Sequence, residues 1–308
     1  MSAPRYKRLR WLTRSGFFVL FVLAPPLDLF RLDLNQGHFY FLGMDWTLGL
    51  TAFQHGEIGP GQAVANLLLR GFLPIALVIG VGGWVAWRYG RLYCGWLCPH
   101  FSVVETINHL MLRASGKPSL WEHKPLPILQ ADGRRLEIQP VYWLWTLLAA
   151  LGFAFLWAVS LLTYLLPPVT IYHNLLHAEL TRNQGLFIGI ATLLFSLEFL
   201  LARHLFCRFG CAIGFAQSVI WMANPRAMVV SFDKARGTAC KDCVQACDNT
   251  CPMRLKPRKN KRHMFTCTQC SACLQACDQV MRNDPPGLLH FASGQKQAAW
   301  TSGQREKP

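Results

Sequence analysis

The chain has 308 residues, of which 52% are hydrophobic and 12 are cysteines, and its formal net charge is +15. This length accommodates one or two domains. The apolar residues form long runs in the first two thirds of the chain, whereas the last third is polar, basic and rich in cysteine. The distribution therefore excludes a uniformly water-soluble protein and predicts a membrane part followed by a soluble part.

The positive charges flank the apolar runs. A basic cluster precedes the first run, and many more Lys and Arg residues follow the last one. The first cluster consists of Arg5, Lys7, Arg8, Arg10 and Arg14. Cytoplasmic flanks of membrane proteins carry such an excess of Lys and Arg. We therefore expect membrane lipid, and no nucleic acid, as the partner of these charges.

Four apolar stretches approach the ~20 residues that a helix needs to cross a bilayer. They are residues 17–30, 67–87, 141–166 and 186–206. The first is short and is interrupted by Pro25, Pro26 and Asp28. A cleaved signal peptide is the alternative for this stretch, but no small-residue cleavage site follows it, which favours an uncleaved anchor.

The loops between these stretches predict the orientation of the chain. Residues 31–64 and 167–184 contain few Lys or Arg residues, whereas residues 88–138 contain many. The charge-poor loops are therefore expected outside the cell. Both termini and the cysteine-rich part are then expected on the cytoplasmic side of a bacterial inner membrane.

An internal repeat follows the second and fourth apolar stretches. Residues 92–98 (LYCGWLC) are similar to residues 205–211 (LFCRFGC). Each phrase is followed by an amphipathic stretch, at 101–112 and 213–223, of the kind that lies in a membrane interface. The pattern predicts two copies of helix, helix, cysteine pair and surface helix, with a chance similarity as the alternative.

The strongest chemical signal is a cysteine run with gaps of two, two and three residues. Its members are Cys267, Cys270, Cys273 and Cys277. This spacing is that of the cluster-binding loops of bacterial ferredoxins. Disulfides and zinc are the alternatives, but zinc sites usually show two separated cysteine pairs. The run therefore predicts a [4Fe–4S] cluster.

A second run has one additional residue between its second and third cysteines. Its members are Cys240, Cys243, Cys247 and Cys251, and Pro252 follows. In two-cluster ferredoxins the fourth cysteine of each run binds the cluster of the other run. By that rule, one cluster is held by Cys240, Cys243, Cys247 and Cys277. The other is held by Cys267, Cys270, Cys273 and Cys251.

These patterns predict a membrane α-helical protein of four transmembrane helices with a C-terminal, cytoplasmic, two-cluster ferredoxin-like domain of the small α+β class. We expect a membrane domain over residues 1–223, which includes both Cys-x3-Cys repeats. The ferredoxin-like domain is expected over residues 224–290. The polar residues 291–308 are expected to form a disordered tail.

The cysteine pairs Cys94/Cys98 and Cys207/Cys211 are each spaced i, i+4. On one continuous helix, this spacing places both sulfurs on the same face. If the two repeats pack together, four thiolates meet at a third metal centre, which would hold copper or an iron–sulfur cluster because thiolates favour soft metals. The alternative is that they are small buried residues at helix ends.

Three further ionisable residues are candidates for function. Glu198 lies at membrane depth, where a carboxylate is costly, and would relay protons or pair with Arg203. His173 and His177 are spaced i, i+4 in the second outer loop. They would bind a quinol, a haem or a metal ion, or they are polar residues of the membrane interface.

Several phrases also resemble a known family. They are residues 39–43 (FYFLG), 93–99 (YCGWLCP), 215–218 (FAQS), 232–237 (FDKARG) and 277–281 (CDQVM). The chain resembles the membrane-bound polyferredoxins, which include the quinol-oxidising membrane subunit of periplasmic nitrate reductase. It is more similar to the cytochrome oxidase accessory proteins of the nitrogen-fixation cluster type, although Ala212 stands where that family has proline.

The resemblance implies an electron-transfer oxidoreductase with two [4Fe–4S] clusters. Its closer branch implies a cupric-reductase-like accessory factor for respiratory oxidase assembly. One alternative is a quinol dehydrogenase membrane subunit that feeds a respiratory reductase. Another is a membrane redox sensor or assembly factor without turnover. The expected partners are membrane lipid, a copper ion or a quinone/quinol, and a redox partner protein.

Overall fold

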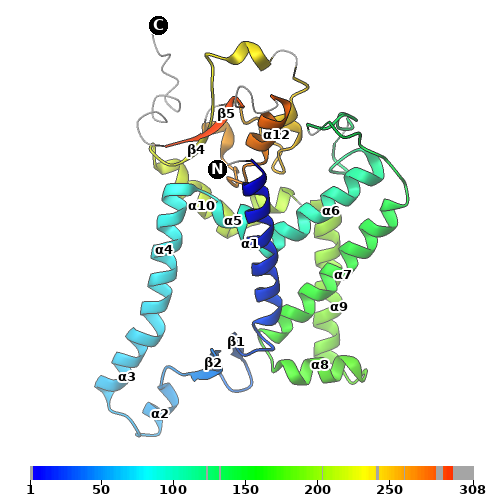
Figure 1. The fold of residues 1–308 in the computed structure, drawn as a ribbon. Coiled ribbons are helices and arrows are strands. Elements are labelled where there is room, and N and C mark those ends of the chain that lie inside the picture. The colour runs from blue at the N-terminus through cyan, green and yellow to red at the C-terminus, as the bar shows by residue number, and fades with distance from the viewer. Residues whose placement is uncertain are drawn as a thin grey trace. The chain divides into compact units, whose positions relative to one another are not determined.

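The computed structural model describes residues 3–122, 124–131, 133–202, 204–240, 243–259, 261–281 and 287–293. Figure 1 shows its helices and strands. The contacts divide the chain into two compact units. Unit 1 contains Met1–Phe18, Gly83–Ala150 and Glu198–Pro308. Unit 2 contains Val19–Gly82 and Leu151–Leu197. Each unit thus combines distant parts of the chain, and the predicted domain boundary at residue 223 stays a prediction.

Unit 2 is built from helices and one small sheet. It contains parts of the helices α1 (Ala3–Leu23), α4 (Leu73–Tyr89) and α7 (Tyr142–Thr163), and all of α2 (Leu50–Gln54), α3 (Pro60–Asn66), η1 (Leu67–Phe72), α8 (Pro168–Leu176) and α9 (Arg182–Leu197). The antiparallel sheet has the order β1 (Phe30–Asp33), β2 (His38–Phe41), β3 (Met44–Trp46), with Phe30 opposite Phe41 and Phe39 opposite Trp46. The Leu32 N–H donates to the Tyr164 carbonyl at 2.9 Å, which attaches the sheet to the end of α7. A core around Ala158, Leu162 and Ile188 holds α7, α8 and α9 together.

Unit 1 carries all of the cysteines. Its helices beyond α1, α4 and α7 are α5 (Leu92–Trp96), α6 (Pro99–Ser115), η2 (Glu198–Ala202), η3 (Phe206–Gly210), α10 (Ala212–Ala223), η4 (Gly237–Cys240), α11 (Ala246–Asn249), η5 (Lys261–Met264) and α12 (Ala272–Val280). The strands β4 (Val229–Phe232) and β5 (Leu289–Ala292) form an antiparallel pair in which Val230 lies opposite Phe291. The small helices α11 and α12 pack against each other beside this pair. The C-terminal part is thus a small α+β fold, as the sequence predicts.

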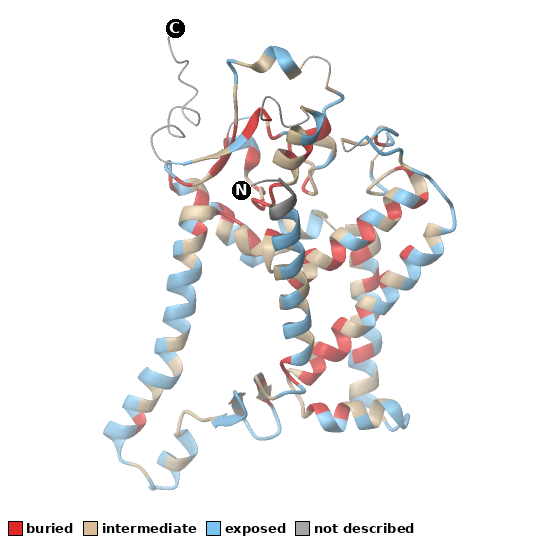
Figure 2. Cartoon of the chain, viewed as in Figure 1, coloured by how far each residue is buried: buried red, intermediate tan, exposed pale blue. Residues whose placement is uncertain are grey.

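Three helices within the described residues are long and apolar enough to cross a membrane. They are Pro60–Tyr89, Tyr142–Thr163 and Arg182–Ala202. Figure 2 shows α4 exposed along most of its length. Its apolar side chains Val78 and Ile79 are each 68% exposed, which suits contact with lipid. Three of the four predicted spans are therefore confirmed as candidate membrane helices.

The predicted span at residues 17–30 is wrong as a continuous helix. Helix α1 ends at Leu23, and the chain turns through a left-handed residue, Asp28 (φ 51°), before β1 begins at Phe30. Prolines 25 and 26 explain the break, because a proline inside a helix removes a backbone donor and clashes with the preceding turn. Asp28 pairs with Arg31. The orientation of the chain in a membrane stays a prediction.

The predicted tail also begins too early. Phe291 and Ala292 belong to β5 and pair with β4. Residues 294–308 lie outside the described part of the chain.

Candidate metal centres

The first candidate centre is a cavity lined by four cysteines. They are Cys251, Cys267, Cys270 and Cys273. The cavity is partly open to solvent, and its other walls include Val230, Met253, Leu255 and Met264. Cys251 comes from the first cysteine run and the other three come from the second. The structure thus brings together the four residues that the cross-binding rule assigns to one cluster.

Left-handed backbone residues shape the loops around this cavity. Gln269 (φ 53°) lies between Cys267 and Cys270, and Ser271 (φ 60°) precedes α12. The first run has the same arrangement, because Gln245 (φ 57°) precedes α11. Such a conformation costs a non-glycine residue roughly 1–2 kcal/mol. It persists where the surrounding structure determines the backbone, which is typical of ligand-binding loops.

Backbone N–H groups point at sulfur in both runs. The Leu255 N–H donates to Cys251 Sγ at 3.4 Å, and the Leu288 N–H donates to Cys277 Sγ at 3.2 Å. Hydrogen bonds to sulfur stabilise a thiolate and tune the reduction potential of an iron–sulfur cluster. The fourth cysteine of each run therefore has the same supporting contact.

The second candidate centre comprises the remaining four C-terminal cysteines: Cys240, Cys243, Cys247 and Cys277. Burial raises the pKa of Cys247 to about 12, and the charges of Asp248 and Cys277 add to the rise. Burial also raises the pKa of Cys277, and the charge of Cys243 adds to this rise. Arg258 Nη1 lies 3.9 Å from Cys240 Sγ. Neighbouring thiols, of which Cys247 and Cys277 have a raised pKa, fit a set of ligands that lose their protons when metal binds.

The structure corrects the placement of the membrane-proximal cysteine pairs. Cys94 lies in α5, but Cys98 precedes α6, with φ −55° and ψ 117°. Cys207 lies in η3, and Cys211 precedes α10 with φ −79° and ψ 109°. The two cysteines of a pair therefore do not share one helical face. For the first pair the reason is Pro99, because the residue before a proline is biased away from helical conformation.

The second cysteine of each pair thus lies at a helix N-terminus. The Gly214 N–H donates to Cys211 Sγ at 3.5 Å. Burial raises the pKa of Cys98, and the backbone N–H groups of Phe101 and His100 oppose that rise. A helix N-terminus favours a thiolate through its free N–H groups and its dipole. In the sequence, the Cys-Pro dipeptide at residues 98–99 indicates that a helix begins after Cys98, because proline is common at the first helical position.

The four membrane-proximal thiols share one neighbourhood. Burial raises the pKa of Cys94 to about 12, and the thiolates of Cys98 and Cys211 add to the rise. Burial also raises the pKa of Cys207, and the other three cysteines contribute. The described residues contain no group of His, Cys, Asp and Glu placed to hold a single metal ion. Ligands of a cluster stand farther apart than ligands of one ion, because they bind different iron atoms.

The Cys94–Cys98 turn packs directly against a loop of the first candidate centre. A Cβ atom on the buried Gly95 would collide with the Thr268 carbonyl. The neighbouring Trp96 Nε1 donates to the Gln269 carbonyl at 3.1 Å. Cys98 and Cys207 pack against the same core as Cys267 and Cys273. Within unit 1, the segments that carry the membrane-proximal thiols thus pack directly against those that carry the ferredoxin-type cysteines.

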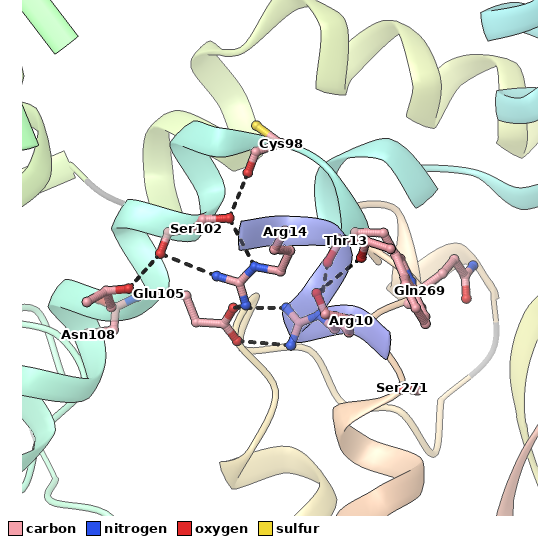
Figure 3. A network of polar contacts seen from close by, with 12 residues as sticks. Arg10, Thr13, Arg14, Cys98, Ser102, Glu105, Asn108, Gln269 and Ser271 are labelled. Carbon is pink, nitrogen blue, oxygen red and sulfur yellow. Dashed lines mark hydrogen bonds and ion pairs between the residues drawn. The ribbon is translucent and has the colours of Figure 1, made fainter. Parts of the chain in front are cut away.

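A buried ion-pair network supports this turn from the other side (Figure 3). Arg10 Nη2 lies 2.9 Å from Glu105 Oε2, and Arg14 pairs with the same carboxylate. Arg10 also donates to the Gly95 carbonyl at 2.9 Å, and Ser102 Oγ donates to the Cys98 carbonyl at 3.1 Å. Burial opposes ionisation of Glu105, but the two arginines lower its pKa. Arg10 and Arg14 are therefore part of the fold rather than charges that only face lipid.

Glu198 lies beside this region. Its Oε1 is 3.2 Å from His100 Nε2, and its Oε2 is buried without a hydrogen-bond partner in the described part of the chain. Its predicted partner Arg203 lies outside the described residues. The rings of His173 and His177 stack at 4.2 Å in unit 2, and their role stays a prediction.

Residues 69–118 match the family described as "4Fe-4S binding domain". This segment contains Cys94 and Cys98 and precedes the ferredoxin-type runs. The chain is also similar to YccM of Escherichia coli (strain K12), whose name provisionally assigns it to electron transport, with 25% identity over 203 residues. That match covers 65% of this chain and 49% of the relative, so the chain matches about half of the relative's length. No solved structure matches the chain. These similarities support an iron–sulfur electron-transfer family.

Proposed function

We propose that this chain transfers electrons between a partner at the membrane and a soluble redox protein, through thiolate-held iron–sulfur clusters. Three groups of cysteines carry the route: Cys94, Cys98, Cys207 and Cys211; then Cys251, Cys267, Cys270 and Cys273; then Cys240, Cys243, Cys247 and Cys277. The observation that supports it most is the packing of Gly95 and Trp96 on the loop at Thr268 and Gln269. It brings the first two groups side by side within unit 1.

A [4Fe–4S] cluster supplies a site that accepts and donates single electrons. The residues of this chain would hold the cluster and set the reduction potential at which it exchanges electrons. Thiolates hold the iron, and the N–H groups of Leu255 and Leu288 stabilise the charge on sulfur. Apolar walls such as Met253 and Leu255 shield part of the cavity from water. Hydrogen bonds to sulfur and exposure to solvent are the protein's means of setting a cluster potential.

For the membrane-side partner, we propose first a copper ion, reduced from Cu(II) to Cu(I) for oxidase assembly. Thiols are the soft ligands that Cu(I) prefers. Because no three groups among the described residues are placed to hold one ion, copper would bind two of these thiols at a time. In this role each electron that reaches Cys94, Cys98, Cys207 or Cys211 reduces one copper ion, and no proton is exchanged with the substrate.

The second candidate partner is a quinol, and Glu198 favours it. Its unpartnered Oε2 is an acceptor for a quinol O–H, and ionisable groups at membrane depth are typical of proton pathways. A quinol would release two electrons to the clusters and two protons, one of them to this carboxylate and the other to water. A redox sensor or assembly factor, the third candidate, would carry the clusters without turnover.

The deciding experiment uses the full chain purified in detergent. After iron and sulfide analysis, the oxidised protein is mixed with a short-chain quinol, and the reduced protein is mixed with Cu(II) and a Cu(I) chelator. Rapid cluster reoxidation by Cu(II) that Cys98→Ser abolishes supports the copper role. Cluster reduction by quinol that Glu198→Gln slows supports the quinol role. Absence of cluster iron would overturn the proposal as a whole, and absence of both reactions would leave the sensor.

A further inference from the structure

Arg91 is a buried cation that has no carboxylate partner within the described part of the chain. It is 1% exposed. Its Nε donates to the Gly214 carbonyl and to Ser218 Oγ, each at 2.7 Å, and its Nη1 donates to the Cys207 carbonyl at 2.8 Å. Its Nη2 has no hydrogen-bond partner among the described residues. A guanidinium taken out of water without a counter-charge costs several kcal/mol, so this position needs an explanation.

The surrounding chain is built to receive this side chain. A Cβ atom on Gly214 would come within 3.1 Å of both Arg91 Cζ and Nη2, so a residue other than glycine would crowd the guanidinium. Ser218 accepts from Arg91 and donates to the Phe265 carbonyl at 2.7 Å. Arg91 is therefore connected to α10 on one side and to the segment before Cys267 on the other.

The negative charges that act on Arg91 come from thiolates of two candidate centres. Burial lowers its pKa, whereas the thiolates of Cys94, Cys211, Cys207 and Cys267 raise it. Three of these cysteines belong to the membrane-proximal group, and Cys267 belongs to the first ferredoxin-type group. Arg10 and Arg14 provide the contrast, because both have the carboxylate of Glu105. A purely structural role for Arg91 would need only the three hydrogen bonds that it already makes.

We propose that Arg91 is the shared counter-ion of the membrane-proximal centre and of the neighbouring cluster that includes Cys267, and that it raises the reduction potential of both. This inference rests on the proposed function. A [4Fe–4S] cluster with four thiolate ligands carries net negative charge, and reduction adds one more. A cation close to both centres stabilises the reduced state of each, in the low dielectric of a buried site. Arg91 acts through the thiolates and is a charge-balancing, positioning residue.

The test compares Arg91→Gln, Arg91→Lys and Gly214→Ala with the control Arg88→Gln. Arg88 is a half-buried arginine three residues earlier, and its side chain donates to the Arg226 carbonyl. Redox titrations followed by electron paramagnetic resonance give the midpoint potentials, and a chelator assay gives the rate of iron loss. We expect Arg91→Gln to lower the potentials and to speed iron loss about tenfold or more. Arg91→Lys should have midpoint potentials close to those of wild type, and Arg88→Gln should have the same potentials as wild type. Gly214→Ala should lower the potentials less than Arg91→Gln does.

Thermal unfolding of the loaded and cluster-free forms adds a readout that does not depend on electron transfer. We expect Arg91→Gln to cost more stability in the loaded protein, because only there does the cation have its counter-charge. Unchanged potentials in loaded Arg91→Gln would overturn the role of Arg91. If that variant does not fold, an unchanged potential and unchanged iron loss in Gly214→Ala would overturn it. Wild-type protein without iron would instead overturn the proposed function.

Discussion

Trp96 Nε1 donates a 3.1 Å hydrogen bond to the backbone carbonyl of Gln269, although the two residues are 173 positions apart in the chain. Trp96 lies between the two membrane-proximal cysteines Cys94 and Cys98, and Gln269 lies between Cys267 and Cys270. The bond therefore joins the middle of one cysteine motif to the middle of another. The proposed route for electrons between these two groups of thiols would pass close to this contact.

We predict that Gly95→Ala separates these motifs. The new Cβ would collide with the Thr268 carbonyl, a backbone atom that cannot rotate away. We expect a loss of about 1–3 kcal/mol, the usual cost of overpacking, and slower electron transfer between the membrane-proximal and ferredoxin-type centres. Denaturant unfolding in detergent and time-resolved reduction would measure both effects.

Gly82→Ala is the matched control for this variant. Gly82 lies in α4, and no atom within 4 Å would meet a Cβ there. Alanine is also the better helix former by roughly 1 kcal/mol, so Gly82→Ala should be neutral or slightly stabilising. Wild-type stability and electron transfer rates in Gly95→Ala would contradict the packing.

A second prediction separates the cysteine groups by iron content. Wild-type protein should contain about eight iron atoms in the two ferredoxin-type clusters, and more if the membrane-proximal thiols hold a cluster. Cys270→Ser should lose one cluster and weaken the other, because each run supplies a ligand to both. Cys98→Ser should keep both ferredoxin-type clusters and stop electron transfer to the acceptor. Normal copper reduction and quinol turnover in both Cys98→Ser and Cys211→Ser would make these cysteines packing residues.

The sequence predicts those features that depend on short-range spacing. Apolar length alone identifies the three candidate membrane helices, because a bilayer fixes the minimum length of a span. Cys251 and the three cysteines of the other run that the ferredoxin rule assigns to one cluster line one cavity. Whether they bind one cluster stays a prediction.

The features that the sequence does not reveal depend on contacts between distant residues. Arg10 and Arg14 read as charges before an apolar run, yet they meet Glu105 more than 90 positions later. Arg91 reads as one more basic residue after a span, yet it is buried by α10. Cys211 precedes a helix without the proline that marks Cys98. Whether a charge is buried depends on the residues around it in three dimensions, and the spacing of residues in the sequence does not reveal these neighbours.

A third prediction concerns the side of the membrane on which α1 begins. Arg10 bonds both Glu105 in α6 and the Gly95 carbonyl, so the start of α1 must lie on the same side as α6. We expect reporters fused before Met1, within residues 117–121 and after Pro308 all to behave as cytoplasmic. A reporter within residues 34–37 should behave as external. An external signal from the N-terminal fusion alone would contradict the Arg10–Glu105 pair in the membrane-inserted protein.

The last prediction concerns the pH dependence of the Glu105 network. Arg10 and Arg14 lower the pKa of Glu105 from its ordinary value of 4.5. A carboxyl group whose pKa is lower in the folded state stabilises the protein above its unfolded-state pKa, and this contribution is lost as the pH falls through the lowered value. Glu105→Gln should therefore cost about 3–5 kcal/mol at pH 7, because it leaves two buried arginines unpaired. The difference in the free energy of unfolding between Glu105→Gln and wild type should become smaller as the pH falls below about 4.5. Denaturant unfolding at each pH measures this difference.

Glu122→Gln serves as the control for this measurement. Glu122 pairs with Arg254 at 2.7 Å, but both side chains are more than a quarter exposed. Solvent-exposed ion pairs contribute roughly 0–1 kcal/mol, so this variant should change the free energy of unfolding little at any pH. If Glu105→Gln proved as mild as Glu122→Gln at pH 7, Glu105 would not be the counter-charge of Arg10 and Arg14. The support that these arginines give to the Cys98 turn would then rest on their bonds to Gly95 and Ser102 alone.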